Sequence, residues 1–311
     1  KVKNLSKNEA IFKGEDVLAF FTSDSQEEVN FDDYMQIEFD EEVLQIKNTW
    51  DIFSLNDKAI QEDFDLITEG RTSQPIPEGT RYLCKENIFI EEGAKITFAI
   101  LNALSGPIYI GKDAEIMEGS AVRGPFAMGE SSVLKLNTKI YGATTLGPYC
   151  KVGGEINNSV LMAYSNKGHD GFLGNSVIGE WCNLGADTNN SNLKNNYATV
   201  KLWHYETGRF ANTGLQFCGL IMGDHSKCGI NTMFNTGTVI GVSANIFGSG
   251  FPRNFVPSFS WGGASGFTEY KTNKVFEVAE VVLKRRNLVF DEKDQKILTH
   301  IFEETKKYRN Y

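Results

Sequence analysis

The chain has 311 residues, a formal net charge of −9 and no dense cluster of lysine or arginine, which excludes a surface built to bind nucleic acid or an anionic membrane. Its 30 glycines against 7 prolines indicate many tight corners, and its five cysteines without a CxxC pair indicate a reduced, cytoplasmic protein. No apolar run approaches the roughly 20 residues that span a bilayer, and no signal peptide opens the sequence.

The first 47 residues predict the end of an α/β domain. Short apolar runs, such as 16–21, alternate there with acidic loops. A linker helix is expected from Thr49 to Ile67, because apolar residues recur at helical spacing. Since the sequence begins with Lys1 instead of methionine, we expect the start of this first domain to lie upstream.

A six-residue ladder organises the middle of the chain. Stepping by six from Ile110 meets an apolar side chain at every rung, and four residues after most rungs the side chain is small. This period is typical of a β-helix, in which three hexads close one triangular coil of about 18 residues and coils stack about 4.8 Å apart. Ile90 and Ile96 are the first predicted rungs, and Leu104 is expected to join the register. The regular rungs are Ile110, Ile116, Val122, Met128, Leu134, Ile140, Leu146 and Val152.

After Val152 the ladder slips by two residues and loses one apolar rung. We expect it to resume at Val160, to carry Asn166 at the missing rung, and to continue through Phe172, Ile178 and Leu184. The period disappears from 194 to 220, where a projecting loop is predicted, and returns from Met222 to Ile246. A scaffold interrupted at one place suggests a functional site there.

Two helices are predicted after the aromatic, glycine-rich run 251–263. The second should begin after Asp291, a good N-cap, and its apolar face must pack on the end of the prism or on another subunit. The expected domains are 1–68, 69–265 and 266–311.

Of the four histidines, His169 is the candidate for chemistry. It lies in the run NKGHDGF, where the ladder loses its rung, beside a lysine and two glycines. His204, His225 and His300 are expected to serve packing, turn or surface roles.

The run GHDGFLGNSVIGEWCNLGADTNNSN at 168–192 resembles the motif GHxxYxGDxxIGxxxNxGAGTxxxN of the bacterial bifunctional UDP-N-acetylglucosamine pyrophosphorylase/glucosamine-1-phosphate N-acetyltransferases. Residues from about 49 to 309, including WDIFSLN and GPIYIGKDAEIMEGS, are similar to a divergent branch labelled sugar-phosphate nucleotidyltransferase or glucose-1-phosphate thymidylyltransferase. The resemblance implies a mainly β fold, a left-handed parallel β-helix of hexapeptide repeats. A partial α/β nucleotidyltransferase segment would precede it, and C-terminal helices would follow.

The implied activity is acetyl transfer from acetyl-CoA to an amino-sugar 1-phosphate such as glucosamine 1-phosphate, within a bifunctional enzyme that makes nucleotide sugars for the cell envelope. The partners would be small molecules and two further copies of the chain in a homotrimer. Mg²⁺ would serve the nucleotidyltransferase part, and no metal is expected at the β-helix.

The resemblance also implies roles for individual residues. His169 would act as the base that takes a proton from the attacking amine, and Asn192 would hold the amine or its acetyl group. Backbone N–H groups near Ala186 would meet the thioester oxygen. The expected sugar-phosphate contacts are Lys167, Phe172 and Asn183, and the expected CoA contacts are Ala186 and Arg253.

The sequence departs from the family at three places. The family's GPFARxR is GPFAMGE at 124–130, which removes the arginines near the phosphate. Arg123, Lys151 or Lys167 could take their place. Phe172 keeps the ring of the usual tyrosine without its hydroxyl, and Asp187 stands where the family has glycine.

Two other interpretations stay open. The protein could perform nucleotidyl transfer alone, with the β-helix as a trimerising or regulatory platform. It could also be a non-catalytic binding or structural β-helix in which His169 caps a coil.

Overall fold

The structure is a computed structural model that describes residues 2–25 and 28–311, and it divides into two compact units at Gln45 and Ile46. The smaller unit holds a three-stranded sheet of order β2-β1-β3 around a core of Ala10, Phe12 and Tyr34. Strands β1 and β2 form an antiparallel hairpin, and β3 lies parallel to β1. The elements are η1 (Val2–Asn4), β1 (Glu9–Lys13), β2 (Asp16–Phe20), η2 (Phe31–Asp33) and β3 (Met35–Glu38).

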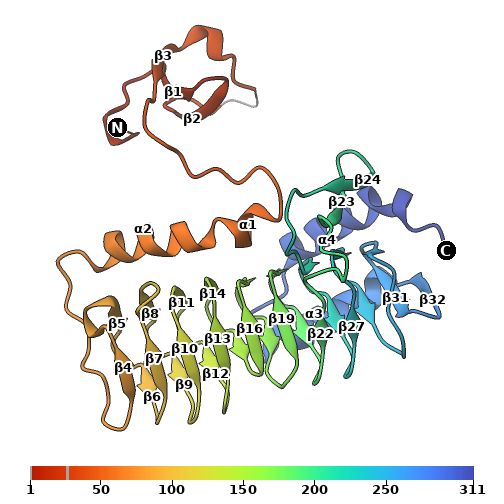
Figure 1. The fold of residues 1–311 in the computed structure, drawn as a ribbon. Coiled ribbons are helices and arrows are strands. Elements are labelled where there is room, and N and C mark those ends of the chain that lie inside the picture. Colours follow the sequence, from red (N-terminus) through yellow and green to blue (C-terminus); the bar gives the residue numbers. More distant parts are fainter. Residues whose placement is uncertain (1, 26–27) are drawn as a thin grey trace. The chain divides into compact units, whose positions relative to one another are not determined.

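The larger unit is a mainly β, parallel solenoid, which confirms the predicted β-helix (Figure 1). Three sheets form the walls of the prism, and each regular coil adds one short strand to each of them as far as β19 (Phe172–Gly174), where the first sheet ends. Sheet 1 contains β4 (Arg81–Leu83), β7 (Ile100–Asn102), β10 (Ala121–Arg123), β13 (Lys139–Tyr141), β16 (Glu155–Asn157) and β19 (Phe172–Gly174). Sheet 2 contains β5 (Ile88–Ile90), β8 (Ile108–Ile110), β11 (Phe126–Met128), β14 (Thr144–Leu146), β17 (Val160–Leu161), β20 (Val177–Ile178), β25 (Leu220–Met222), β28 (Thr238–Ile240) and β30 (Phe255–Val256).

Sheet 3 forms the last wall and ends in an antiparallel pair, β31 and β32. It contains β6 (Lys95–Ile96), β9 (Glu115–Ile116), β12 (Val133–Leu134), β15 (Lys151–Val152), β18 (Asn166–Lys167), β21 (Asn183–Leu184), β26 (Lys227–Cys228), β29 (Asn245–Ile246), β31 (Ser260–Gly263) and β32 (Gly266–Glu269). The pair β22 (Asn189–Asn190) and β27 (Met233–Phe234) is assigned outside these sheets, and η3 spans Lys85–Asn87.

The predicted rungs from Ile110 to Val152 all lie in the buried core of the prism. So do the rungs from Met222 to Ile246. Leu104, by contrast, is 63% exposed and does not join the ladder; Leu101 is buried in its place. The stacked apolar interior is what holds the coils together, because an isolated hexad cannot bury its own rung.

The predicted register is wrong just after Val152. Leu161, Lys167 and Leu173 point inward, in register with rungs of the preceding coil, so Val160, Asn166 and Phe172 are not the rungs. The reason is that two corners of this coil are shortened, the first by two residues and the second by one. The second lies between Ile156 and Leu161, which are five positions apart, whereas Ile140 and Leu146 are six apart. The first has the larger effect. Four residues separate Val152 from Ile156, whereas six separate the equivalent rungs Leu134 and Ile140 one coil earlier. Gly153 and Gly154 turn this short corner, and Gly154 does so at φ +77°, which favours glycine.

Helices α1 (Asp51–Ser54) and α2 (Asn56–Thr68) confirm the helix predicted near the start of this unit. Buried Asn56 anchors α2 to the prism: its amide donates to the Ala143 carbonyl at 3.0 Å and accepts from the Thr145 hydroxyl at 2.8 Å. Ile60 and Phe64, on the inner face of the helix, are buried.

The segment from 194 to 220 does not project as a free loop. It contains a hairpin of β23 (Lys201–His204) and β24 (Arg209–Asn212) whose Val200 and Leu202 are fully buried. Trp203 stacks on Phe255 of the solenoid at 4.1 Å. Apolar residues at these positions require burial, which draws the insertion onto the prism.

Helices α3 (Thr272–Lys284) and α4 (Glu292–Glu304), followed by η4 (Lys306–Tyr308), confirm the two predicted C-terminal helices. Asp291 caps α4 in a capping box with Asp294. Leu298 of α4 packs with Val275 of α3 and Phe259 of the solenoid, so the apolar face of α4 is covered within the same chain.

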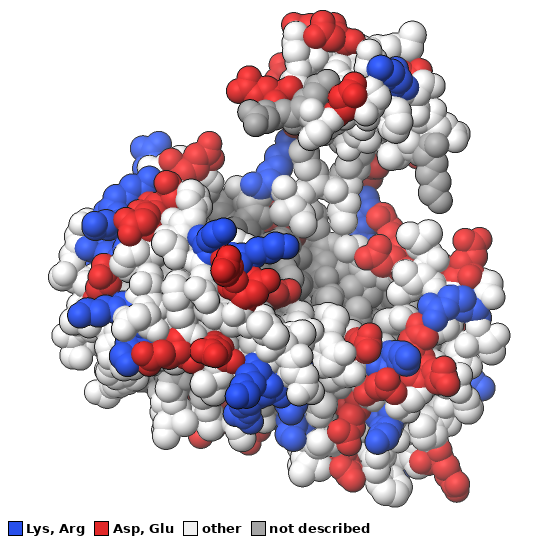
Figure 2. Space-filling view, turned by 180° about the vertical axis from the view of Figure 1, so that it is seen from behind, with Lys and Arg blue, Asp and Glu red and all other residues white. Residues whose placement is uncertain are grey.

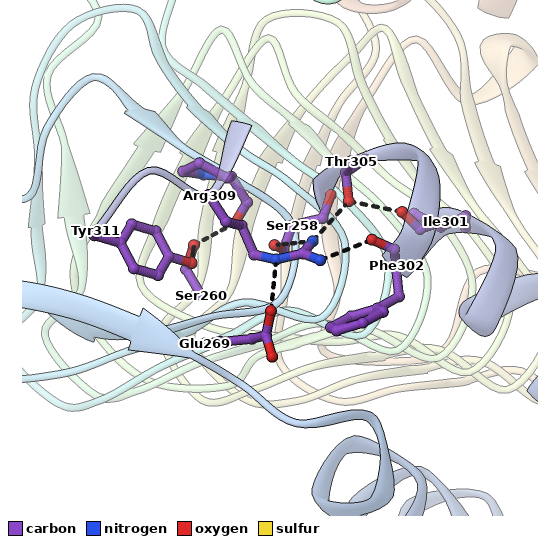
Figure 3. Close-up of polar contacts among 9 residues, drawn as sticks. Ser258, Ser260, Glu269, Ile301, Phe302, Thr305, Arg309 and Tyr311 are labelled. Carbon is purple, nitrogen blue, oxygen red and sulfur yellow. Dashed lines mark hydrogen bonds and ion pairs between the residues drawn. The ribbon is translucent and has the colours of Figure 1, made fainter. Parts of the chain in front are cut away.

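Arg309 fastens the C-terminal segment, as Figure 3 shows. Its side chain is 2% exposed and pairs with Glu269 at 3.3 Å. The guanidinium also donates to the carbonyls of Phe302 and Ser258 and to the hydroxyl of Thr305, at 2.8, 3.4 and 3.1 Å.

Replacing Arg309 by alanine is expected to lower the free energy of unfolding by about 1.5–3 kcal/mol, the usual range for hydrogen bonds to a charged group. Thermal unfolding of the variant measures the effect. Arg285→Ala removes the same charge from an exposed position and should change stability little. Equal melting temperatures for the two variants would contradict this role for Arg309.

Candidate active site

The short corner opens a trough in the edge of the prism. Gly153, Gly154 and Gly168 form part of its lining without side chains, and His169 and Ala186 line it from the following coils. The volume is about 420 Å³, within the range of small-molecule sites. The trough therefore lies where the predicted ladder slips.

His169 is exposed in this trough. It lies two residues after the end of β18, and its turn is fixed through main-chain carbonyls. The carbonyl of His169 accepts a hydrogen bond from the Lys167 ammonium at 2.8 Å, and the carbonyl of Asp170 accepts from the Asp187 amide at 3.0 Å. The imidazole is thus presented by a held backbone and is open to a ligand.

Lys167 lies inside the prism, where the sequence suggested Asn166. It is 1% exposed, and its ammonium donates to the carbonyls of Gly153 and His169 at 3.1 and 2.8 Å. Burial lowers the pKa of this lysine to about 8. We expected the Lys167 ammonium to contact the sugar phosphate. Instead it donates to main-chain carbonyls inside the prism.

Phe172 and Asn192 come together beside Gly174. A Cβ atom at Gly174 would lie 2.4 Å from the Phe172 ring and 2.8 Å from the Asn192 amide nitrogen, so the glycine makes room for both. Asn192 also donates to the Asn175 side chain at 2.8 Å. These side chains come from β19 and from the segment just beyond β22.

The other two predicted residues stand apart from this pair. Asn183 is exposed on β21, three residues before Ala186. Arg253 precedes β30 near the last coil, with its guanidinium 5.9 Å from the Phe267 ring. The structure thus brings together His169 with Ala186, and Phe172 with Asn192.

Charge around the trough is mixed. Asp170 and Asp187 line it together with Lys135. On the face shown in Figure 2, acidic and basic side chains are interspersed. Recognition of an anionic ligand would therefore depend on contacts with individual lysine or arginine side chains more than on a positive electrostatic potential over a wide surface.

Metal-binding clusters and membrane-spanning helices are both absent from residues 2–25 and 28–311. Within these ranges no group of three or more histidine, cysteine, aspartate or glutamate side chains is arranged to hold a metal ion. No helix in the described part of the chain is long and apolar enough to cross a bilayer.

Comparison with known proteins gives one family match. Residues 1–72 match the model of a family described as sugar nucleotidyl transferase, which supports the prediction of a transferase and of a nucleotidyltransferase segment ahead of the β-helix. No curated protein sequence matches the chain.

Several solved structures resemble the chain at low identity. The polySia-specific acetyltransferase NeuO is 11% identical, with 61% of this chain and 82% of that chain covered and a TM-score of 0.32. AntD, an N-acyltransferase from Bacillus cereus in complex with dTDP and 3-hydroxybutyryl-CoA, is 14% identical over 67% and 91% of the two chains, with a TM-score of 0.25. Arabidopsis UDP-N-acetylglucosamine acyltransferase is 15% identical over 71% and 80%, with a TM-score of 0.27.

Proposed function

We propose that the β-helix transfers an acetyl group from acetyl-CoA to the amino group of a sugar 1-phosphate such as glucosamine 1-phosphate. The observation that carries the proposal is the exposed His169 in a trough that it shares with the Ala186 turn. A base and a candidate backbone donor, the Ala186 N–H, then border the same space, as acyl transfer requires.

The proposed reaction uses the groups that line the trough. His169 takes a proton from the sugar amine as the amine nitrogen attacks the thioester carbon. The backbone N–H of Ala186 stabilises the oxyanion, since the amides of Gly185 and Asp187 on either side already donate to main-chain carbonyls. Collapse of the oxyanion breaks the C–S bond. The proton leaves with the thiol of CoA, so the products are the N-acetylated sugar phosphate and free CoA.

The substrate contacts belong to the same proposal. Asn192 and Phe172 would hold the sugar, with Asn183 at its far side, and Arg253 would meet CoA from a neighbouring copy in a homotrimer. A cytoplasmic location is included because all five cysteines are free thiols.

The test is release of free thiol when the chain is mixed with acetyl-CoA and glucosamine 1-phosphate. We expect one equivalent of CoA and one of N-acetylated product per turnover. Glucose 1-phosphate, which lacks the amine, is the matched control and should release nothing above background. Absence of thiol release with the amino sugar phosphate would refute the proposal.

A second function is favoured by the match of residues 1–72 to sugar nucleotidyl transferases. In this alternative the protein joins a nucleoside triphosphate to a sugar 1-phosphate, and the β-helix assembles or regulates it. Pyrophosphate release from UTP or dTTP, without thiol release from acetyl-CoA, would identify it.

A further inference from the structure

Lys167 occupies a core position that the repeat fills with apolar residues elsewhere. It pairs across β15 and β18 with the fully buried rung Val152, and it is one of the largest fully buried side chains described. A leucine there would bury a similar volume with no charge to desolvate. An ammonium at such a position costs free energy, which calls for a compensating role.

The contacts of the ammonium suggest that role. Its two acceptors are the carbonyl of Gly153, at the short corner, and the carbonyl of His169, in the turn of the next coil. The amide of Gly153 donates back to the carbonyl of Lys167 at 2.7 Å. One side chain therefore ties the corner that opens the trough to the residue that faces it.

The chemistry of the acceptors explains why the residue is lysine. Both partners are carbonyl oxygens, so the side chain must supply two donors, and an ammonium has three. Asn190, another buried polar side chain of the prism, meets a different demand. It accepts from the Gly174 amide at 2.9 Å and donates to the Gly174 carbonyl at 3.0 Å, which suits a neutral amide.

We propose that Lys167 is a positioning residue: from inside the prism its ammonium holds the main chain of His169 against Gly153 and so fixes the imidazole in the trough. The catalytic consequence rests on the proposed function, because it needs His169 to act on a substrate. The structural part stands without it.

The experiment compares Lys167→Met with Lys227→Met. Methionine keeps the length and apolar stem of lysine without its donors. Lys227 is the matched control, because it is a partly buried lysine whose ammonium also donates to a main-chain carbonyl, that of His225 at 2.9 Å, at a different corner.

The first readout is hydrogen–deuterium exchange. In Lys167→Met we expect exchange to accelerate at least about tenfold at the amides that donate to the carbonyls around this turn. These amides are those of Gly153, Glu155 and Asp187, which donate to the carbonyls of Lys167, Gly171 and Asp170. Lys227→Met should leave these amides unchanged. Unaltered exchange in Lys167→Met would overturn the proposal, whatever the activity of the protein.

The second readout is the rate of CoA release. Loss of position by about 1 Å costs roughly 100-fold, so kcat should fall by about that factor while KM for acetyl-CoA changes little. Faster exchange with an unchanged kcat would overturn the link to His169. If the unaltered chain releases no CoA, the proposed function has failed, and the exchange data still decide whether Lys167 holds the turn.

A second variant guards against misfolding. Lys167→Gln supplies one carboxamide group and can donate to both carbonyls only with strained geometry, so its exchange and kcat should lie between those of the unaltered chain and Lys167→Met. Values equal to the unaltered chain would count against the proposal.

Discussion

Replacing His169 by alanine is expected to lower the rate of CoA release from acetyl-CoA by two to four orders of magnitude, the usual contribution of a general base. The imidazole is exposed in the trough, and its turn is held through the main chain, so the fold should survive the change. Steady-state thiol release with glucosamine 1-phosphate measures the effect.

The control for this variant is His300→Ala, an exposed histidine on α4. It should keep the full rate, and both variants should melt within a degree or two of the unaltered chain, as surface substitutions usually do. A His169→Ala protein that retains the full rate would remove the base from the proposed mechanism. A large fall in its melting temperature would mean instead that the ring has a structural role.

Replacing Lys167 by methionine is expected to stabilise the protein at neutral pH and to alter the dependence of stability on pH. The pKa of Lys167 is lowered from 10.5 to about 8, first by burial, so between these pH values the unfolded chain binds more protons. The free energy of unfolding therefore rises with pH across this window. Below pH 8 the full cost of the buried charge is present, about 3–4 kcal/mol at roughly 1.4 kcal/mol per pKa unit.

The charges around Lys167 act in both directions. Asp170, Asp187 and Cys228 raise its pKa, and Lys139 lowers it further, but burial outweighs them all. In Lys167→Met the pH-dependent contribution disappears, while two carbonyls lose a donor at a cost of about 1–3 kcal/mol. The stability of the variant relative to the unaltered chain should thus be greatest at pH 7, and the difference should fall and then change sign as the pH approaches 10.5.

Thermal unfolding of both proteins from pH 7 to 10.5 checks this expectation. Lys227→Met serves again as the comparison, since burial also lowers the pKa of Lys227. Parallel stability curves for the unaltered chain and Lys167→Met would show that the charge of Lys167 carries no such cost. If Lys167→Met is more stable and less active than the unaltered chain, lysine at this core position serves function at the expense of stability.

The sequence predicted the regular part of the solenoid because its rungs repeat at a constant interval. Every rung from Ile110 to Val152 is buried, since the period of six reports directly which side chain points inward. The prediction failed where the interval changes. The sequence shows that the ladder shifts, but it does not show at which corner the residues are missing. The glycine pair at 153–154 was the one signal in the sequence that could have identified the corner.

The contents of the site were harder to predict than its place. The motif around His169 locates the coil, but Lys167 was expected to contact the sugar phosphate, and lysine is almost never fully buried unless it is paired. Its partners are main-chain carbonyls, which a sequence does not display. Likewise, the sequence does not show why residue 174 is glycine. The reason is visible only in the folded chain, where a side chain at Gly174 would collide with Phe172 and Asn192.

The shortened corner at Gly153 and Gly154 implies that the identity of the rung residues and the number of residues at a corner control different features of the fold. The rungs decide whether coils stack, whereas the number of residues at a corner decides the outline of the edge. Here the recess lined by Gly153 and Gly154 lies at a corner that has two residues fewer than the same corner one coil earlier. Evolution on such a scaffold can therefore create or erase sites through small insertions and deletions at corners while the interior stays the same.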